Sequence, residues 1–261
     1  MIELDPYKFH TVSPLFDEID HNVALVYSVI EGNSPGRIFV DHPHSPSSAF
    51  LFPEGTYYYV GGSENNEKFN RALVRLIFQD LLPHAIEKEL ILFAFSDAWR
   101  EKLDSLLSDR GVTRIYRKIF TFNPTRFEIH AGWRERIPEG FYLRHIDEQF
   151  AEKHPVYKPI VDPGAKKFGV CLLKDDEIVS ACTSVCVGRN KAEIDIHTAE
   201  KYRKQGFAIL TACAFIETCL SKGLTPNWAC WPERKASCAL AKNLGFENKP
   251  DVPAHYWAES Q

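Results

Sequence analysis

The clearest pattern of apolar and polar positions lies in the second half of the chain. Four short stretches there are apolar or alternate between apolar and polar residues, which is typical of β-strands. They lie at residues 141–146, 168–174, 178–187 and 192–198. Turns at 175–176 and 188–190 join the last three, and such short connections predict an antiparallel meander. A helix is expected over 147–157, between the first two strands.

After the meander, the pattern predicts a helix, a strand and a second helix. Residues 207–220 are apolar on almost every side, which is typical of a helix buried against a sheet. The second helix is expected from about Glu233, with Pro232 at a favoured position at its start and Gly245 at its end. Strands are expected around this helix, at 225–231, Phe246 and 254–258, the last two closing this half of the chain.

The first half of the chain repeats this order of elements more faintly. Helical periodicity over 14–30 is followed by three expected strands, a helix, a strand, a helix and a last strand. In that order they lie at 37–41, 49–53, 56–60, 69–82, 90–95, 97–108 and 115–122. We therefore predict two domains of similar topology, residues 1–125 and 138–261, joined by the segment 123–137.

Composition narrows the class of protein. Of the 261 residues, 44% are apolar and 25% are charged, as in a packed globular protein. A net charge of −4 argues against a general nucleic-acid binder, because neutralising phosphates requires a positive surface. The N-terminus lacks the apolar stretch of a signal peptide, and no later stretch is long enough to span a bilayer. Seven scattered cysteines do not resemble a secreted disulfide framework, so we expect a cytoplasmic protein with no membrane or nucleic-acid partner.

No metal site is expected from the sequence. Cys182 and Cys186 would share a strand face but lie about 13 Å apart, too far for one zinc ion. His42 and His44 alternate along the chain, and no companion ligands stand out nearby. Buried thiols and loop histidines are the favoured interpretation of these residues.

The segment 192–208, AEIDIHTAEKYRKQGFA, carries the strongest functional signal. An expected strand runs into a basic loop and then into the buried helix, so several backbone N–H groups and a helix N-terminus can face one anion. Gly206 would let the backbone approach a phosphate without a Cβ in the way, and Arg203 and Lys204 add positive charge. The alternative is that these basic residues form only a solvated loop.

The motifs around this loop resemble a known family. Residues 203–208, RKQGFA, fit the R/Q-x-x-G-x-G/A signature of the GNAT superfamily of acetyltransferases, after the fourth strand and at the start of a helix. Downstream, Ser237 and the Leu-Gly-Phe of 244–246 resemble the family's last helix and its terminal Gly-Phe. The stretches EIDIHT, YRKQGFA, LTPNWAC and ALAKNLGF look like the bacterial subgroup that includes the zwittermicin A resistance acetyltransferase. By motif, the resemblance covers about residues 140–261.

The resemblance implies an α+β fold with a mixed, mostly antiparallel GNAT-type sheet flanked by helices, and a first half that is a diverged GNAT-like domain. It implies transfer of an acetyl group from acetyl-coenzyme A (acetyl-CoA) to a primary amine of a small molecule. Pairing with a second copy of the chain, as a homodimer, is an open alternative. The residues implied in cofactor binding are Ile196, Thr198, Arg203, Lys204, Gln205, Gly206, Phe207, Ala208 and Ser237.

Two side chains of the fourth strand are candidates for the base that removes a proton from the amine. Glu193 is the first candidate, because related enzymes often place a carboxylate near this position, and His197 is the second. By strand alternation, Glu193, Asp195 and His197 share one face. The alternative is an ordinary polar outer face of an antiparallel strand.

Two positions depart from the family pattern. Arg234 stands where many members have Asn, and Ala241 stands where many have a Tyr that protonates the departing thiolate. Either the thiolate leaves unassisted, or Ser237, Cys238 or Tyr256 substitutes. A non-catalytic acyl-CoA sensor or partner-binding module is therefore the alternative function.

The corresponding loop of the first half lacks positive charge. Gly61 and Gly62 would suit a phosphate, but Glu64 and Glu67 would repel one, and no basic residue of this loop precedes Lys68. We therefore predict that the first half binds no coenzyme A (CoA) and packs on the catalytic half.

Overall fold

The computed structural model describes residues 1–55 and 57–259, which form two compact units. The first unit consists of residues 1–117 and 252–259, and the second of residues 118–251. Strand β6 (Thr113–Phe122) contributes its first half to one unit and its second half to the other.

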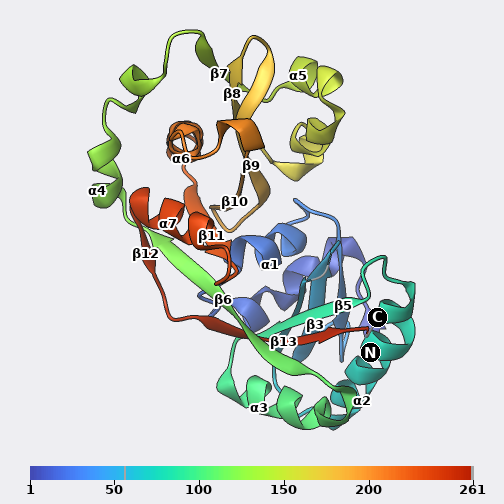
Figure 1. The fold of residues 1–261 in the computed structure, drawn as a ribbon. Helices are drawn as coiled ribbons and strands as arrows, with labels where there is room; N and C mark the ends of the chain where they lie inside the picture. Colours follow the sequence, from blue (N-terminus) through green and yellow to red (C-terminus); the bar gives the residue numbers. More distant parts are fainter. Residues whose placement is uncertain (56, 260–261) are drawn as a thin grey trace. The chain divides into compact units, whose positions relative to one another are not determined.

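The second unit is built on a mixed, mostly antiparallel sheet (Figure 1). Its strands are β7 (Phe141–His145), β8 (Gly169–Lys174), β9 (Glu177–Gly188), β10 (Lys191–Thr198), β11 (Thr225–Cys230), the end of β6, and β12 (Phe246–Asn248). The predicted meander is confirmed, since β7 to β10 are antiparallel neighbours, and β11 adds parallel to β10. Both hairpin turns have two residues with φ between 47 and 63°, as tight hairpins require, and these are Asp175, Asp176, Arg189 and Asn190.

Helices cover both faces of this sheet. The predicted buried helix is α6 (Phe207–Ser221), and Val170 and Leu172 of β8 pack in its core cluster. The alternate β8 residues Cys171 and Leu173 instead join the cluster of α5 (Glu148–Lys153), on the other face (Figure 1). The strand alternation thus divides these four β8 side chains between two cores, one on each face of the sheet.

The remaining helices of the second unit are shorter than the apolar pattern predicts or were not expected. The helix expected over 147–157 ends as α5 at Lys153 and continues as a 3₁₀ turn, Pro155–Ile160, because proline cannot continue the hydrogen-bond ladder. Helix α7 (Lys235–Asn243) has Arg234 at its N-cap, so Pro232 precedes the helix and is not its first residue. A short helix, α4 (Pro124–Phe127), lies in the segment expected to join the halves.

The first unit has a sheet with a similar order of pairing. Its strands are β1 (Ile2–Glu3), β2 (Gly36–Val40), β3 (Ser48–Pro53), β4 (Tyr57–Gly62), β5 (Glu89–Ala94), β13 (Val252–Ala258) and the start of β6. Strands β1 to β4 are antiparallel neighbours, and β5 adds parallel to β4, as β11 does to β10. Thr56, at the start of one expected strand, lies outside the described residues.

The expectation for the last strand was wrong. Strand β13 pairs with β5 and with the first half of β6, and therefore belongs to the first unit instead of closing the second. An alternating apolar pattern predicts a strand but does not specify its neighbours, because strands distant in sequence often pair.

The helical segments of the first unit also differ from the expected bounds. The helix expected over 14–30 is interrupted: a 3₁₀ helix, Pro6–Phe16, precedes α1 (Val23–Ile30), and Asn22 between them has φ 51°. Helix α2 (Glu67–Arg75) continues as a π-helical turn, Leu76–Leu81, and a 3₁₀ turn, Leu82–His84. Helix α3 (Asp97–Leu106) is capped by the Ser96 hydroxyl, which accepts from the Trp99 N–H.

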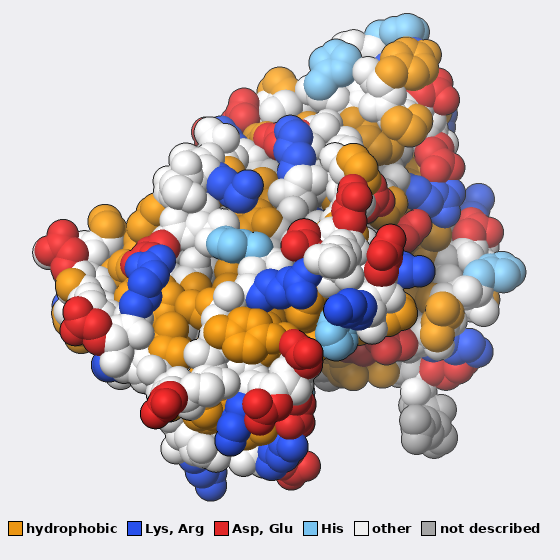
Figure 2. Space-filling model, turned by 90° about the horizontal axis from the view of Figure 1, so that it is seen from above, with side chains coloured by type: hydrophobic (Ala, Val, Ile, Leu, Met, Phe, Trp, Pro, Cys, Tyr) orange, Lys and Arg blue, Asp and Glu red, His pale blue; other side chains and the backbone are white. Residues whose placement is uncertain are grey.

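The charged side chains show no segregation on the face displayed in Figure 2, where Lys and Arg are interspersed with Asp and Glu. In the part of the chain that the structure describes, no helix combines the length and the apolar character needed to cross a bilayer.

A buried histidine of the first unit is paired with a carboxylate. His255 of β13 is 3% exposed, and its Nε2 lies 2.9 Å from Oδ1 of Asp104 in α3. Asp104 also pairs with Arg114. Burial lowers the pKa of His255 because it disfavours the charged imidazolium, and Asp104 offsets this lowering only in part.

We expect the free energy of unfolding to decrease as the pH falls below about 6.5, the ordinary pKa of an unfolded histidine. A histidine with a lowered folded pKa takes up its proton more readily after unfolding, so acid favours the unfolded chain. Urea unfolding between pH 8 and pH 5.5 measures this slope. His255→Gln, whose amide can still donate to Asp104, should reduce the slope; an unchanged slope would assign it to other groups.

Candidate active site

The parallel strands β10 and β11 separate in the middle of the second unit. Their ladder pairs Lys191 with Thr225, Ala192 with Pro226, and Glu193 with Asn227. Beyond this last pair, β10 runs on to Thr198 and β11 to Cys230. The edge of β10 over residues 194–198 is therefore not paired with β11.

The pairing of β10 with β9, on its other side, shows which residues direct their backbone N–H and C=O groups toward that edge. The Ala199 N–H donates to the Val179 carbonyl at 3.0 Å, which makes this a hydrogen-bonded pair of the β9–β10 ladder. Hydrogen-bonded pairs alternate along an antiparallel ladder, so the backbone N–H and C=O groups of His197 also point toward β9. The backbone groups of Ile196 and Thr198 therefore point toward the open edge. The two residues predicted to offer backbone groups thus lie on the unpaired side of β10.

The predicted loop connects that edge to the N-terminus of α6. Gly206 is the N-cap residue with φ 85°, and a Cβ added there would meet nothing within 4 Å. The positive φ favours glycine for backbone reasons alone, and the open space beside it leaves room for a ligand. Gly206 has no capping side chain, and the hydrogen bonds of α6 begin with the Ile209 N–H, which donates to the Gly206 carbonyl at 3.0 Å. The N–H groups of Phe207 and Ala208 therefore precede the helical ladder.

Several loop side chains are held by protein partners. Lys201 pairs with Glu177 at 2.7 Å, Arg203 Nε donates to the Thr198 carbonyl at 3.1 Å, and Gln205 Nε2 donates to the Lys201 carbonyl at 3.0 Å. These bonds fix the loop against the end of β10. Arg203 and Lys204 remain exposed cations beside Gly206.

Phe207 anchors the start of α6 in the core. Its side chain is 5% exposed, and its ring stacks on Phe141 of β7 with centroids 4.8 Å apart. Core packing by itself therefore explains why an aromatic residue follows Gly206, and this explanation does not depend on a bound ligand.

The candidate bases lie in different environments. Glu193 is 2% exposed, whereas Asp195 and His197 are exposed. Glu193 accepts a hydrogen bond from the Asn227 side-chain amide, across the last rung before β10 and β11 separate. The alternative interpretation, an ordinary solvent-exposed polar face, therefore fits Asp195 and His197 but not Glu193. The sequence reasoning missed Asn227, although an Asn in an otherwise apolar parallel strand was a signal.

Ser237, in the first turn of α7, has a structural partner. Its hydroxyl accepts from Nε1 of Trp228 at 3.1 Å, and Trp228 is 2% exposed. The hydroxyl proton is still available to a further acceptor. Of the other groups considered as proton donors, Cys238 follows Ser237 on α7, and Tyr256 belongs to β13 of the first unit.

Ser237→Ala is expected to lower the free energy of unfolding by about 1–3 kcal/mol, because the buried Trp228 N–H loses its acceptor. Ser237→Thr, which keeps the hydroxyl, is the matched control. Urea unfolding of the three proteins measures the difference. Equal midpoints for the wild type and Ser237→Ala would mean that this hydrogen bond contributes nothing to stability.

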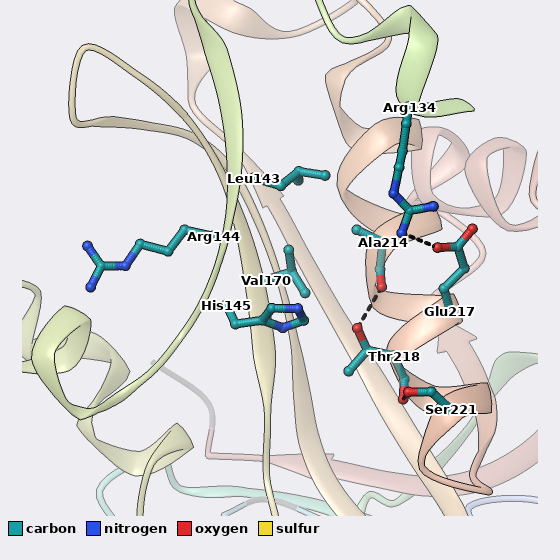
Figure 3. Close-up of a pocket in the computed structure, with 9 residues that line it drawn as sticks. All are labelled: Arg134, Leu143, Arg144, His145, Val170, Ala214, Glu217, Thr218 and Ser221. Atoms are coloured by element: carbon teal, nitrogen blue, oxygen red, sulfur yellow. Dashed lines mark hydrogen bonds and ion pairs between the residues drawn. The ribbon is translucent and has the colours of Figure 1, made fainter. Parts of the chain in front are cut away.

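A pocket of about 430 Å³ opens elsewhere in the second unit, between β7, β8 and the second half of α6 (Figure 3). Its lining residues are Arg134, Leu143, Arg144, His145, Val170, Ala214, Glu217, Thr218 and Ser221. Arg134 pairs with Glu217, while the Arg144 side chain points away from the pocket (Figure 3). The predicted site residues do not line this pocket, so it is distinct from the loop at Gly206.

The residues that the structure describes contain no group of three His, Cys, Asp or Glu side chains that could hold a metal ion.

A family model described as GNAT acetyltransferase matches residues 13–254, and the chain therefore belongs to the GNAT acetyltransferase family. It is accordingly an N-acetyltransferase, from a family whose enzymes use acetyl-CoA.

Relatives match over nearly the whole chain. An uncharacterized N-acetyltransferase, YdfB of Bacillus subtilis (strain 168), is 29% identical over 263 residues, with 97% of each chain covered. A GCN5-related N-acetyltransferase-like protein from Streptococcus suis 89/1591 has a TM-score of 0.68 at 24% identity, over 96% of this chain and 98% of that one. A tandem GNAT protein from the clavulanic acid biosynthesis pathway has a TM-score of 0.65 at 14% identity, over 96% and 93%. These two structures support the GNAT-like fold of a mixed sheet flanked by helices.

Proposed function

We propose that this enzyme transfers an acetyl group from acetyl-CoA to a primary amine of a small molecule. The observation that carries the proposal is the unpaired edge of β10, which leads directly into the glycine turn at the N-terminus of α6. An extended, amide-bearing chain can pair with such an edge as an added strand would, while the turn binds the diphosphate at the end of that chain.

The chain's residues divide into three roles. The N–H and C=O groups of Ile196 and the N–H of Thr198 bind the amides of the cofactor arm, while the Thr198 carbonyl accepts from Arg203. The N–H groups around Gly206 bind the phosphates. Arg203 and Lys204 add positive charge, and Gln205 holds the turn through the Lys201 carbonyl. Acetyl-CoA supplies the activated acyl group when it is bound.

Glu193 is proposed as the base. Only a neutral amine attacks the thioester, so the ammonium form must lose a proton to Glu193, directly or through a water molecule. Asn227 holds one carboxylate oxygen by its amide N–H, which orients the carboxylate at the point where the two strands separate. His197, exposed four residues further along β10, is the second candidate.

Protonation of the departing thiolate needs a group other than residue 241. Ala241 is fully buried and has no titratable proton. Ser237, Cys238 and Tyr256 are the candidates, and unassisted departure is the alternative, because a thiolate is a better leaving group than an alkoxide.

The test is release of CoA thiol from acetyl-CoA in the presence of a panel of small amines. Thiol release that depends on an amine, together with acetylated product of the expected mass, supports the proposal. Binding of acetyl-CoA without turnover on any amine would favour the alternative, a non-catalytic acyl-CoA sensor or partner-binding module. The resemblance to the zwittermicin A resistance subgroup makes aminated, antibiotic-like compounds the first acceptors to include.

We further propose that the first unit is a diverged GNAT-like domain that binds no acetyl-CoA. Its parallel ladder pairs Tyr57–Val60 with Ile91–Ala94 up to the end of β5, so the separation seen in the second unit is missing there. A Cβ at Gly61 would meet the Phe16 ring at 2.7 Å, and one at Gly62 would meet the Ser47 carbonyl at 2.2 Å. Protein atoms thus occupy the space that is open beside Gly206.

The helix after this loop is also closed to an anion. The Asn66 side chain accepts from the Phe69 N–H and so caps α2, and Glu67 in its first turn adds negative charge. A calorimetric titration with acetyl-CoA should give one equivalent per chain. Two equivalents would refute this proposal and leave the catalytic assignment of the second unit standing. The cytoplasmic location and the lack of nucleic-acid and membrane partners stay predictions.

A further inference from the structure

Two cysteines of the second unit bring their sulfur atoms together. Cys230 is the last residue of β11, Cys238 lies in α7, and their Sγ atoms are 3.2 Å apart. Neither cysteine is in a disulfide in this structure. A disulfide bond is about 2.05 Å long, so the two sulfurs need to approach by only about 1.2 Å to form one.

A lysine lies beside this pair. Lys118 of β6 is directly opposite Cys230 in the antiparallel β6–β11 ladder, so the two side chains project from the same face with Cβ atoms about 5 Å apart. Its Nζ pairs with Asp251 at 3.0 Å, which holds the ammonium group in place. The pKa of Lys118 is raised mainly by Asp251, and the two thiols add to this rise. A fixed ammonium group favours the thiolate form of a neighbouring cysteine.

The two thiols differ in access to solvent. Cys238 is partly exposed, whereas Cys230 is 6% exposed. A dissolved oxidant therefore reaches Cys238 first, and Cys230 is the neighbour that can attack the oxidised sulfur. This arrangement of an accessible thiol and a resolving thiol is the one that forms disulfides readily.

Other cysteines of the second unit lie in environments that suppress this reaction. Burial raises the pKa of Cys171, Cys213 and Cys219 to about 12, because an apolar environment disfavours the thiolate. All three are completely buried. They provide internal controls for selective oxidation.

We propose that Cys230 and Cys238 form a reversible intramolecular disulfide, an oxidative modification site between β11 and α7. With hydrogen peroxide as oxidant, the Cys238 thiolate attacks one peroxide oxygen, which gives a sulfenic acid and, after protonation, water. The Cys230 thiolate then attacks the Cys238 sulfur, the S–O bond breaks, and the hydroxide leaves as a second water. Two thiols are oxidised to one disulfide, and one peroxide is reduced to two waters. A dithiol reductant reverses the step.

The experiment treats the reduced full-length protein with stoichiometric hydrogen peroxide and counts thiols after denaturation. The count should fall from seven to five, and peptide mapping should recover the segments containing Cys230 and Cys238 linked, with the loss of two hydrogens. Dithiothreitol should restore seven thiols. The Tm of the oxidised form should rise by several degrees, because the crosslink restricts the unfolded chain.

Three variants sharpen the test. Cys238→Ser should abolish the linked peptide and the rise in Tm, whereas Cys213→Ala, which removes a fully buried thiol, should keep both. Lys118→Gln should slow the reaction several-fold, because it removes the positive charge beside the two sulfurs. Peptide mapping of the oxidised wild-type protein tests the proposal even if a variant folds poorly. Recovery of Cys238 as a sulfinic acid, a disulfide between other cysteines, or no oxidation of this pair would overturn the proposal. No readout requires acetyl transfer, so the result is independent of the proposed function.

Discussion

Glu193→Gln is expected to lower kcat for acetyl transfer by about 10²- to 10⁴-fold, the usual contribution of a general base. Gln has nearly the same shape, and its carbonyl oxygen can still accept the hydrogen bond from Asn227. The variant therefore removes the proton acceptor while keeping the last rung of the β10–β11 ladder occupied. Steady-state kinetics with a reactive amine measure the effect, and KM for acetyl-CoA should change little.

Asp195→Asn is the matched control for this variant. It makes the same carboxylate-to-amide change on the same strand, but at an exposed position. Its kcat should stay close to that of the wild type. The remaining activity of Glu193→Gln should rise with pH, because only amine already deprotonated in solution can attack. If Glu193→Gln and His197→Ala both retain full turnover across the pH range, the base lies elsewhere or is not needed.

Gly206→Val is expected to weaken binding of acetyl-CoA by at least about 100-fold. The valine side chain would stand in the open space beside the turn, where the phosphates are proposed to bind. Two lost hydrogen bonds from backbone N–H groups to a charged phosphate amount to about 3 kcal/mol or more, which corresponds to this factor. A β-branched residue at φ 85° also strains the turn, at a cost of about 1–3 kcal/mol in stability.

Gly223→Val separates the two effects. Gly223 follows the other end of the same helix with φ 69°, and a Cβ there also meets nothing within 4 Å. This variant should lose a similar amount of stability but bind acetyl-CoA as the wild type does. Calorimetry for the dissociation constant and urea unfolding for stability give both quantities. Equal affinities for the two variants would remove the Gly206 turn from the proposed binding site.

Much of the second unit was predictable because the determining interactions are local. Asp175-Asp176 and Arg189-Asn190 favour left-handed turns, and those turns join neighbouring strands into the meander. The nearly continuous apolar surface of 207–220 required a buried helix, which is α6. The loop before it could be recognised from the sequence because its glycine and its basic residues are consecutive.

The expectations that failed depended on partners distant in the sequence. Strand β13 was expected in the second half, but it pairs with β5 and the start of β6 in the first unit. The helix expected over 14–30 breaks at Asn22, where the backbone adopts a left-handed conformation. Periodicity records which side of an element is apolar, and it contains no information about which other element covers that side.

The sequence by itself determined the order of elements, the hairpin turns and the glycine-containing basic loop that opens α6, because short-range backbone preferences set all three. Only the tertiary structure decided that the β10–β11 ladder ends at Glu193 and Asn227, and that Glu193 is buried while Asp195 and His197 are not. It also decided that Cys230 and Cys238 meet. These properties arise from the register between strands and the packing of α7, which depend on contacts between residues far apart along the chain.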